Sequence, residues 1–332
     1  MTRTLFIGGT GNISEACVQR CLELGNVSII TRGKSDVPKG AEAIVANRYD
    51  YNSFKSAVDK QKFDVVVNFV GYDIPELEID YRIFNGKIKQ YIFISSTTVY
   101  KKPHTQIPIT EEYELGNPWS EYAQKKQKCE EWLMDKNSDM FPVTIVRPSH
   151  TFSERWLPNI VSSATWTIPN RLICNKPVFL HDGGESLWTL TSSRDFAVGL
   201  CGLIGLEKSI GEAFHITSDE ANTWKAIYDR YSIELGLEPP EYINIPTDFL
   251  CEYFPEMTAS LKGDKAENAV FDNSKIKSFV PDFQCKYTMT EAVKRSMDWF
   301  KADKARQIVD NRADEKIENI LRKYGEKQNE II

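Results

Sequence analysis

Three side chains in the first half of the sequence have the types and spacing needed to move a proton to or from an alcohol. Ser96 lies in the run SSTTVY (95–100), and Tyr122 and Lys126 begin and end the run YAQKK (122–126). A free phenol, with a pKa near ~10, is a poor base at neutral pH. A lysine four residues along a helix lies on the same face and favours the phenolate. We therefore predict Ser96 to hold a substrate oxygen while Tyr122 exchanges its proton.

A glycine-rich turn near the start of the sequence predicts a cradle for a dinucleotide. The apolar run TLFI (4–7) is followed by GGTGNIS (8–14) and then by a segment with helical periodicity. The first glycine permits a tight turn, Gly11 lets the backbone approach a pyrophosphate, and a helix beginning near Asn12 aims its amides at that anion. Ser14 takes the place of the usual third glycine. We expect the cofactor to contact Gly8, Gly9, Thr10, Gly11, Asn12 and Ile13.

The end of the second expected strand bears on the type of dinucleotide. An acidic residue at this point accepts hydrogen bonds from the ribose hydroxyls of NAD. Here the sequence has Arg32, whose guanidinium is suited to the 2′-phosphate of NADP. We therefore expect NADP rather than NAD, and the alternative is an exposed arginine in a polar loop.

Short Val- and Ile-rich runs alternate with helical periodicity through the first half of the chain, which predicts an α/β fold with a Rossmann-type doubly wound parallel sheet. The expected strands are 5–7, 27–30, 43–45, 65–70, 91–94 and 143–146, and the expected helices are 15–24 and 51–60. We predict a dinucleotide-binding domain over 1–150 with a later return near 180–216, where strands are expected at 178–180 and 213–216. A smaller mixed α/β C-terminal substrate domain is predicted over 151–302, with a helix at 223–235. The charged segment 303–332 is predicted to be an amphipathic helix packed on the body rather than a partner-binding helix.

Composition excludes several other classes. The chain has 332 residues, 41% of them hydrophobic, and a net charge of −6, so neither nucleic acid nor an anionic membrane is expected as a partner. No run approaches the ~20 apolar residues of a membrane-spanning helix. Seven cysteines without a CxxC pair and four scattered histidines predict neither a disulfide framework nor a metal site. A reducing cytoplasmic location and a small-molecule substrate are expected.

The motifs as a set resemble a known family. FIGGTGNIS, VVVNFVG, IFISSTTVY, YAQKK, IVRPSHTF, RDFA and GEAFHITSDE occur in the order found in the extended short-chain dehydrogenase/reductase superfamily, the NAD-dependent epimerase/dehydratase family, across about residues 4–300. The resemblance implies a nicotinamide cofactor and the roles given above to Ser96, Tyr122 and Lys126. It also implies that Lys126 reaches the nicotinamide ribose and that the cofactor lies along Asn68, Phe69, Val70 and Pro148.

The sequence also departs from that family. The stretch between Asn68 and Tyr91 leaves room for only a short crossover helix, as in a divergent branch that includes the chloroplast stem-loop-binding proteins, so the family's helix-bundle dimer is not expected and the oligomeric state stays open. Asn47 replaces the Asp that commonly meets the adenine ring, and Arg48 stands beside it. We include Asn47 and Arg48 among the expected cofactor contacts.

The substrate region differs as well. Trp188 stands where sugar-nucleotide members use an arginine on the substrate diphosphate, and a second arginine is missing near Lys262, which offers a partial substitute. Without these two arginine guanidinium groups to bind a diphosphate, we expect a smaller, less charged polyol, sugar or ketone as substrate. We expect it in a pocket lined by Ser96, His150, Trp156 and Trp188. Core packing is the alternative for both tryptophans, and a structural hydrogen bond is the alternative for His150.

The function expected from the sequence is NAD(P)-dependent hydride transfer at a secondary alcohol or ketone, by an oxidoreductase or epimerase. The alternative is a catalytically idle cofactor-sensing or RNA-associated binding protein on the same fold. Net redox and epimerisation share the first hydride abstraction and stay open. Dehydration shares it too, but Thr97 and Thr98 stand where a dehydratase would want an Asp-Glu pair.

Overall fold

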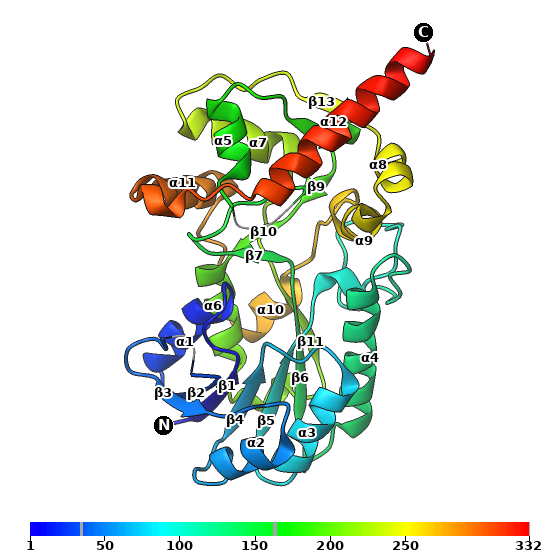
Figure 1. Ribbon diagram of the computed structural model, residues 1–332. Helices are drawn as coiled ribbons and strands as arrows, with labels where there is room; N and C mark the ends of the chain where they lie inside the picture. Colours follow the sequence, from blue (N-terminus) through cyan, green and yellow to red (C-terminus); the bar gives the residue numbers. More distant parts are fainter. Residues whose placement is uncertain (34–35, 162–164, 332) are drawn as a thin grey trace.

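Seven short apolar strands form one fully parallel sheet. The computed structural model describes residues 1–33, 36–161 and 165–331, and the sheet occupies the lower part of Figure 1. Across the sheet the strands follow in the order β11 (Ala213–Ile216), β6 (Val143–Pro148), β5 (Gln90–Ile94), β4 (Val65–Asn68), β1 (Arg3–Ile7), β2 (Asn26–Thr31) and β3 (Glu42–Val45). The order reverses beside β1, where open sheets of this type bind ligands at the carboxyl ends of the strands.

Helices cover both faces of this sheet, because successive residues of each strand are apolar on both sides. On one face α1 (Ser14–Leu22) and α6 (Ser193–Leu203) pack on Phe6, Ile29 and Val67. On the other face α2 (Tyr51–Val58), α3 (Ile74–Phe84) and α4 (Glu121–Lys136) contribute Phe54, Leu77 and Cys129 to a core with Leu5 and Ile7. The predicted α/β class and Rossmann-type doubly wound parallel sheet are confirmed.

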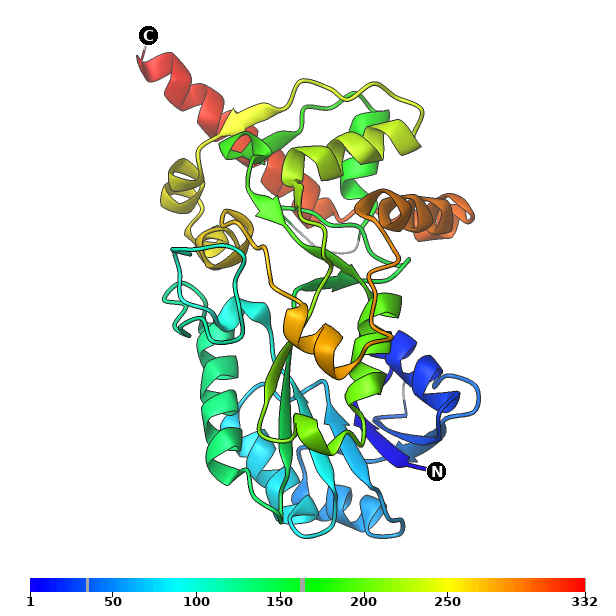
Figure 2. The same cartoon turned by 180° about the vertical axis from the view of Figure 1, so that it is seen from behind.

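The chain returns to the sheet more often than the sequence predicted. β11 pairs with β6 and α6 packs on α1, which lies within the expected return. A further helix, α10 (Ser274–Phe279), packs on β11 and α6 through Ile276, and Figure 2 shows it beside α6. The segment after residue 151 therefore contributes to both halves of the molecule.

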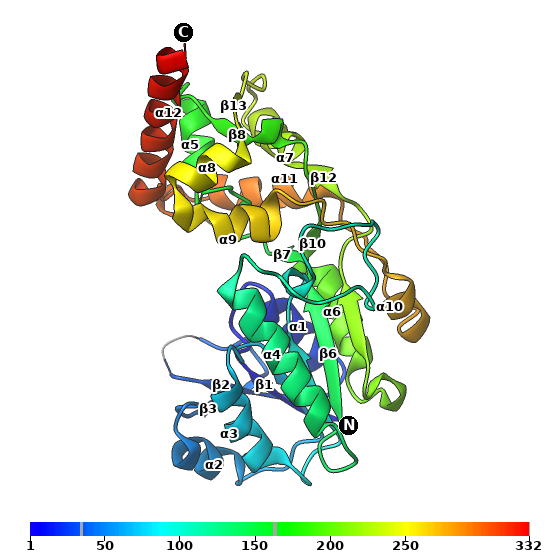
Figure 3. The same cartoon turned by 90° about the vertical axis from the view of Figure 1, so that its right-hand side faces the viewer.

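The second half of the chain forms an upper lobe of helices and short two-stranded sheets (Figure 3). Its sheets pair β7 (His150–Phe152) with β10 (Leu190–Ser192), β8 (Phe179–His181) with β13 (Ile243–Ile245), and β9 (Leu187–Trp188) with β12 (Asn222–Thr223). Its helices are α5 (Thr167–Ile173), α7 (Trp224–Glu234), α8 (Thr247–Tyr253), α9 (Thr258–Ser260), α11 (Met289–Lys301) and α12 (Asn311–Ile331). Its core is rich in aromatic side chains, among them Trp166, Trp188 and Trp224.

The tail helix begins later than expected. The sequence predicted a helix from 303, but α12 begins at Asn311, because the Asp310 carboxylate accepts from the amides of Arg312 and Ala313 at 3.0 and 3.2 Å and caps the first turn. Ile317 and Ile320 are buried against the upper lobe.

Two ends of elements differ from the predicted limits near the expected site. β4 ends at Asn68 rather than at residue 70, because the chain turns there to enter α3. α3 has 11 residues, which agrees with the short crossover helix expected between Asn68 and Tyr91. The expected absence of the family's helix-bundle dimer stays a prediction.

Candidate active site

Ser96, Tyr122 and Lys126 meet at the carboxyl edge of the sheet. Ser96 lies two residues after the end of β5 and caps a single 3-10 turn (Thr97–Val99) by accepting from the Thr98 amide at 3.2 Å. Tyr122 and Lys126 lie in the first two turns of α4, whose N-terminus is capped by Ser120. The strand end and the helix start thus bring together the three residues that the sequence singled out.

Lys126 is fixed by backbone oxygens. Its side chain is 1% exposed, and its ammonium donates to the carbonyls of Gly71 and Ile94 at 2.7 and 2.8 Å. The ammonium lies 5.9 Å from the centre of the Tyr122 ring and 4.6 Å from that of Phe93. Burial lowers the pKa of Lys126 to about 8, so at neutral pH the group still carries its proton.

The Tyr122 phenol is a proton donor at neutral pH. The pKa of Tyr122 is raised to about 12, chiefly by removal of its hydroxyl from water and also by the neighbouring Tyr72, while a hydrogen bond with Ser96 opposes the rise. The ring itself stays reachable, since the side chain is 44% exposed. A protonated phenol bonded to a serine hydroxyl is suited to delivering a proton to a substrate oxygen.

The glycine-rich turn after β1 has the geometry of a phosphate cradle. Gly8 has a φ of +86°, and a Cβ there would lie 2.6 Å from Val70 Cγ1. A Cβ on Gly9 would lie 2.9 Å from Ile29. Ser14 is buried, and its Oγ accepts from the Gly11 amide at 2.9 Å, so it keeps the close packing for which a third glycine is usual.

Asn12 has a different role from the predicted one. α1 begins at Ser14, after Ile13, and not near Asn12. The Asn12 side chain donates to the Thr151 carbonyl at 2.8 Å and accepts from the Ser153 amide at 2.9 Å. Its amide group therefore ties the cradle to the upper lobe instead of facing a pyrophosphate, and contact with the anion is left to the turn's backbone.

A pocket of about 330 Å³ opens beside the cradle and is large enough for the adenosine half of a dinucleotide. Its lining includes Gly8, Thr10, Asn47, Val70 and Tyr72. The exposed Arg32 also lines it and makes no ion pair with any residue in the described ranges. The lining therefore fits the adenosine half of a nicotinamide dinucleotide, and Arg32 adds a positive charge to it.

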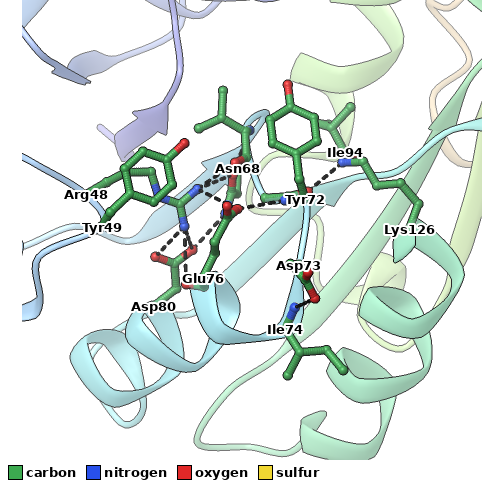
Figure 4. A network of polar contacts seen from close by, with 12 residues as sticks. Arg48, Tyr49, Asn68, Tyr72, Asp73, Ile74, Glu76, Asp80, Ile94 and Lys126 are labelled. Atoms are coloured by element: carbon green, nitrogen blue, oxygen red, sulfur yellow. Dashed lines mark hydrogen bonds and ion pairs between the residues drawn. The ribbon is translucent and has the colours of Figure 1, made fainter. Parts of the chain in front are cut away.

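Two of the expected cofactor contacts, Asn68 and Arg48, bond to other groups of the protein, and Arg48 also lines the pocket. Asn68 is fully buried, and its side chain bonds Asp80, Tyr91 and the Val70 amide. The Arg48 guanidinium is also buried and donates to the Val70 carbonyl at 2.9 Å and to Asp80 at 3.3 Å (Figure 4). Because buried polar groups take protein partners, both side chains hold the loop after β4 from within.

The other two loop positions are better placed to meet a ligand. Phe69 is half-buried and stacks on Phe6 with ring centres 6.0 Å apart, and Val70 lines the pocket. Pro148 is buried at the end of β6.

Comparison with known proteins shows what the part of the chain around this site resembles. The model of the NAD dependent epimerase/dehydratase family matches residues 81–216, which include Ser96, Tyr122 and Lys126. The 2′-dehydrokanamycin reductase of Streptomyces kanamyceticus is 24% identical over 85% of this chain and 80% of its own length. Over residues 81–216 the chain is therefore similar to the NAD dependent epimerase/dehydratase family.

Two further proteins are similar to this chain, one in sequence and one in fold. The chloroplast stem-loop binding protein of 41 kDa b of Arabidopsis thaliana is 25% identical over 74% of this chain and 67% of its own length. The dTDP-glucose 4,6-dehydratase of Bacillus anthracis, solved in complex with NAD, shares the fold with a TM-score of 0.72 and 17% identity, covering 92% of this chain and 98% of that one.

A column of aromatic rings stands where a substrate pocket was predicted. The His150 ring lies 4.0 Å from both Trp156 and Trp188, and Trp188 lies 4.2 Å from Trp224. Trp188 is only 1% exposed, and burial lowers the pKa of His150 well below its usual range. The large apolar faces are stabilised by packing on each other, so Trp188 is a core residue and the packing alternative holds for it. Trp156 is half-buried at the end of the column.

Lys262 does not stand in for the missing arginine. Its ammonium pairs with the Asp248 carboxylate at 2.7 Å and lies 5.4 Å from the centre of the Trp119 ring. The cation is therefore engaged at the surface.

Two residues beside Tyr122 were missed by the sequence analysis. The Tyr72 ring is 45% exposed, its centre lies 6.4 Å from that of Tyr122, and the Lys126 ammonium lies 4.9 Å from it. The negative charge of Asp264 raises the pKa of Tyr122. The place of Tyr72 directly after VVVNFVG could have flagged it, whereas Asp264 reaches the site from far along the chain.

The described residues contain neither a candidate metal site nor a candidate membrane-spanning helix. There, no group of three or more His, Cys, Asp or Glu side chains is placed to hold a metal ion. None of the helices described has both the length and the apolar character needed to cross a bilayer.

Proposed function

We propose that this protein is an NADP-dependent oxidoreductase or epimerase that transfers hydride at a secondary alcohol or ketone of a sugar-like or other small substrate. The observation that carries the proposal is the convergence of Ser96, Tyr122 and the buried Lys126 near a pocket that is large enough for the adenosine half of a dinucleotide. A regulator that only senses a cofactor has no need of this set, whereas hydride transfer to a carbonyl requires a proton donor at its oxygen.

The bound cofactor would supply the hydride or accept it. The cradle at Gly8 and Gly9 and the start of α1 would hold its phosphates, and Arg32 would pair with a 2′-phosphate. The Lys126 ammonium, close to both the loop after β4 and Tyr122, would lie beside the nicotinamide ribose.

Tyr122 would donate the proton to the substrate oxygen, and Ser96 would hydrogen-bond to that oxygen. In the reducing direction hydride adds to the carbonyl carbon, the C=O electron pair moves to oxygen, and that oxygen takes the Tyr122 proton while Ser96 Oγ hydrogen-bonds to it. Solvent returns a proton to the phenolate. A Tyr122 pKa of about 12 favours this direction at neutral pH, because the phenol begins the reaction protonated.

The surroundings favour a substrate without a nucleoside diphosphate. Trp188 is buried in the aromatic column and Lys262 is paired with Asp248, so neither offers a cation to a diphosphate. The relative from Streptomyces kanamyceticus is by name a reductase of 2′-dehydrokanamycin, a keto sugar derivative. This supports keto sugars as the first substrates to test.

A second candidate is supported by the relative from Arabidopsis thaliana, which is by name a stem-loop binding protein. On this alternative the protein binds structured RNA and the catalytic set is idle. The net charge of −6 disfavours it, because RNA phosphates attract cationic surfaces.

The test of the proposal is turnover of a panel of keto sugars, including 2′-dehydrokanamycin, with NADPH and with NADH, and with UDP-glucose as the diphosphate comparator. We expect wild type to oxidise NADPH with at least one keto sugar. The Tyr122→Phe variant should not oxidise NADPH with any of them. Tyr324→Phe, which removes a phenol from the distant α12, is the matched control and should retain full activity. Tight RNA stem-loop binding without turnover by any member of the panel would favour the alternative.

A further inference from the structure

The loop between β4 and α3, residues 69–73, is held by side chains on every side (Figure 4). Its backbone amides donate to side chains that flank it, the Val70 amide to Asn68 Oδ1 and the Tyr72 amide to Glu76 Oε2, each at 2.8 Å. Its carbonyls accept from two cations. Val70 O accepts from Arg48 at 2.9 Å, and Gly71 O accepts from Lys126 at 2.7 Å. Two adjacent peptides are thus fixed by the pocket-lining arginine and by the catalytic lysine.

Arg48 belongs to a buried ion pair. The guanidinium donates to both Asp80 oxygens at 3.3 Å and to the Glu76 carbonyl at 3.2 Å, and Asp80 is fully buried. Asp80 also accepts from Asn68 at 2.7 Å and from the Tyr91 hydroxyl at 2.6 Å. Because such a pair costs desolvation that its attraction barely offsets, its presence points to a role in fixing one geometry.

The loop has little room to move while it is held in this way. A Cβ on Gly71 would lie 3.0 Å from both Leu77 and Phe93, so α3 and β5 close on it from both sides. Val70 touches the cradle at Gly8, and Tyr72 lines the pocket while its ring lies over the Lys126 ammonium. A displacement of this loop would therefore alter the adenosine pocket and the catalytic site together.

We propose that Arg48 is a positioning residue for the catalytic Lys126, acting through the Val70–Gly71 peptides that both cations hold. The proposal builds on the proposed function. Without the Arg48 guanidinium, the Val70 carbonyl loses its hydrogen-bond donor, so the loop is held less firmly. Lys126 then loses the Gly71 carbonyl that keeps its ammonium in place.

Three variants test this. Arg48→Met with Asp80→Asn removes the guanidinium without leaving a buried charge, and Arg48→Lys keeps the charge but not the guanidinium. The matched control is Arg171→Met with Asp314→Asn, which removes another buried arginine and its partner from the upper lobe. The first readout is amide hydrogen exchange of residues 69–72 in the protein alone. The second is the NMR titration of the Lys126 ammonium, assigned with Lys126→Met.

The groups that face the ammonium are Cys129 and Glu130 of α4, Glu76 of α3, Arg48 itself, and the Tyr72 and Tyr122 rings. Wild type should titrate near pH 8. Both Arg48 variants should titrate at higher pH, because a released ammonium regains water. They should also exchange the loop amides about tenfold faster and bind NADPH about tenfold more weakly. The control should match wild type in all three.

Two results would overturn the proposal. One is unchanged loop exchange and Lys126 titration in the Arg48→Met/Asp80→Asn protein. The other is a changed titration in that protein with wild-type behaviour in Arg48→Lys, since the effect would then be one of charge alone. If wild type binds no nicotinamide cofactor, the proposed function fails, and the exchange and titration readouts still decide the role of Arg48.

Discussion

At the scale of single residues, the candidate site is a series of contacts that runs from the pocket beside the glycine-rich turn to Tyr122. Arg48 and Lys126 hold adjacent carbonyls of one loop, and Lys126 lies 5.9 Å from the Tyr122 ring centre. Most of these contacts are to backbone oxygens, which fixes the cations more firmly than exposed side chains would. The geometry of the catalytic set therefore depends on residues that touch no substrate.

Replacing Tyr122 by Phe should abolish turnover and leave cofactor affinity almost unchanged, because it removes the proton donor but no cradle contact. Steady-state kinetics with a substrate from the keto sugar panel and a calorimetric titration of NADPH measure the two effects. Activity within about tenfold of wild type would show that another group supplies the proton.

Cofactor affinity should fall as the pH rises through about 8. Burial holds the pKa of Lys126 near that value, so above it the ammonium loses its charge and its attraction for an anionic cofactor. A charge-assisted hydrogen bond exceeds a neutral one by about 1 kcal/mol, which corresponds to about fivefold in Kd between about pH 7 and about pH 9.5. Calorimetric titrations across this range measure it. Lys126→Met should bind weakly at every pH, and an equal fall in that variant would assign the effect to another group.

The residues that sequence analysis found and those that it missed differ in one respect. Ser96, Tyr122 and Lys126 lie in short local motifs whose spacing carries their chemistry. The role of Asn68 depends on Asp80 and Tyr91, and that of Trp188 depends on His150 and Trp224. Such partners are set by packing between distant segments, which local spacing does not encode.

At the scale of elements, the parallel sheet was predictable because each strand is a short apolar run buried on both faces. The exact ends of helices and strands were not predictable, and neither were the late segments of the chain that pack back on the sheet. α10 packs on β11, whose sequence position is far away, and α12 begins at a cap that separates it from the preceding 3-10 turn. Carboxyl ends of β1, β2, β4 and β5 nevertheless supply the cradle, Arg32, the held loop and Ser96 in the order that the fold class implies.

The end of β2 should set the cofactor preference. Arg32 makes no ion pair within the part of the chain that the structure describes, so one or two charge-assisted hydrogen bonds to a 2′-phosphate, each about 1.5–3 kcal/mol, should favour NADP by at least about tenfold. Arg32→Asp should reverse the preference, because a carboxylate repels the phosphate and accepts from ribose hydroxyls. Arg20→Asp, on the exposed end of α1, is a control for the change in net charge.

Calorimetric titration of both cofactors into these proteins measures the preference. Equal affinities in wild type, or an unchanged ratio in Arg32→Asp, would show that the guanidinium points to solvent.

At the scale of the whole molecule, the tail helix completes the upper lobe. Arg171 of α5 is fully buried, and its guanidinium pairs with Asp314 at 2.6 Å and Glu318 at 3.0 Å on α12. Ile317 and Ile320 are buried on the same helix. The charged tail is therefore a structural part of the lobe that covers the catalytic edge of the sheet (Figure 1).

A chain ending at Asp310 should unfold at a lower temperature and denaturant concentration. It exposes the surface that Ile317 and Ile320 cover, at about 1.5–3 kcal/mol each, and leaves Arg171 buried without its carboxylates, at about 3–5 kcal/mol. Differential scanning calorimetry and urea unfolding measure the loss. A chain ending at Gly325 keeps these contacts and should be as stable as the full chain, and equal stability of both truncations would show that α12 packs only loosely.

The most direct test of the central claim is to follow deuterium from the reactive position of specifically labelled NADPH into product by mass spectrometry, with the keto sugar panel and with wild type, Tyr122→Phe and Tyr324→Phe. Hydride transfer at this site predicts one deuterium on a product carbon in wild type and Tyr324→Phe and none in Tyr122→Phe. Label in the Tyr122→Phe product at the wild-type rate would contradict the role of Tyr122, and no label in any product of wild type would contradict net reduction by NADPH.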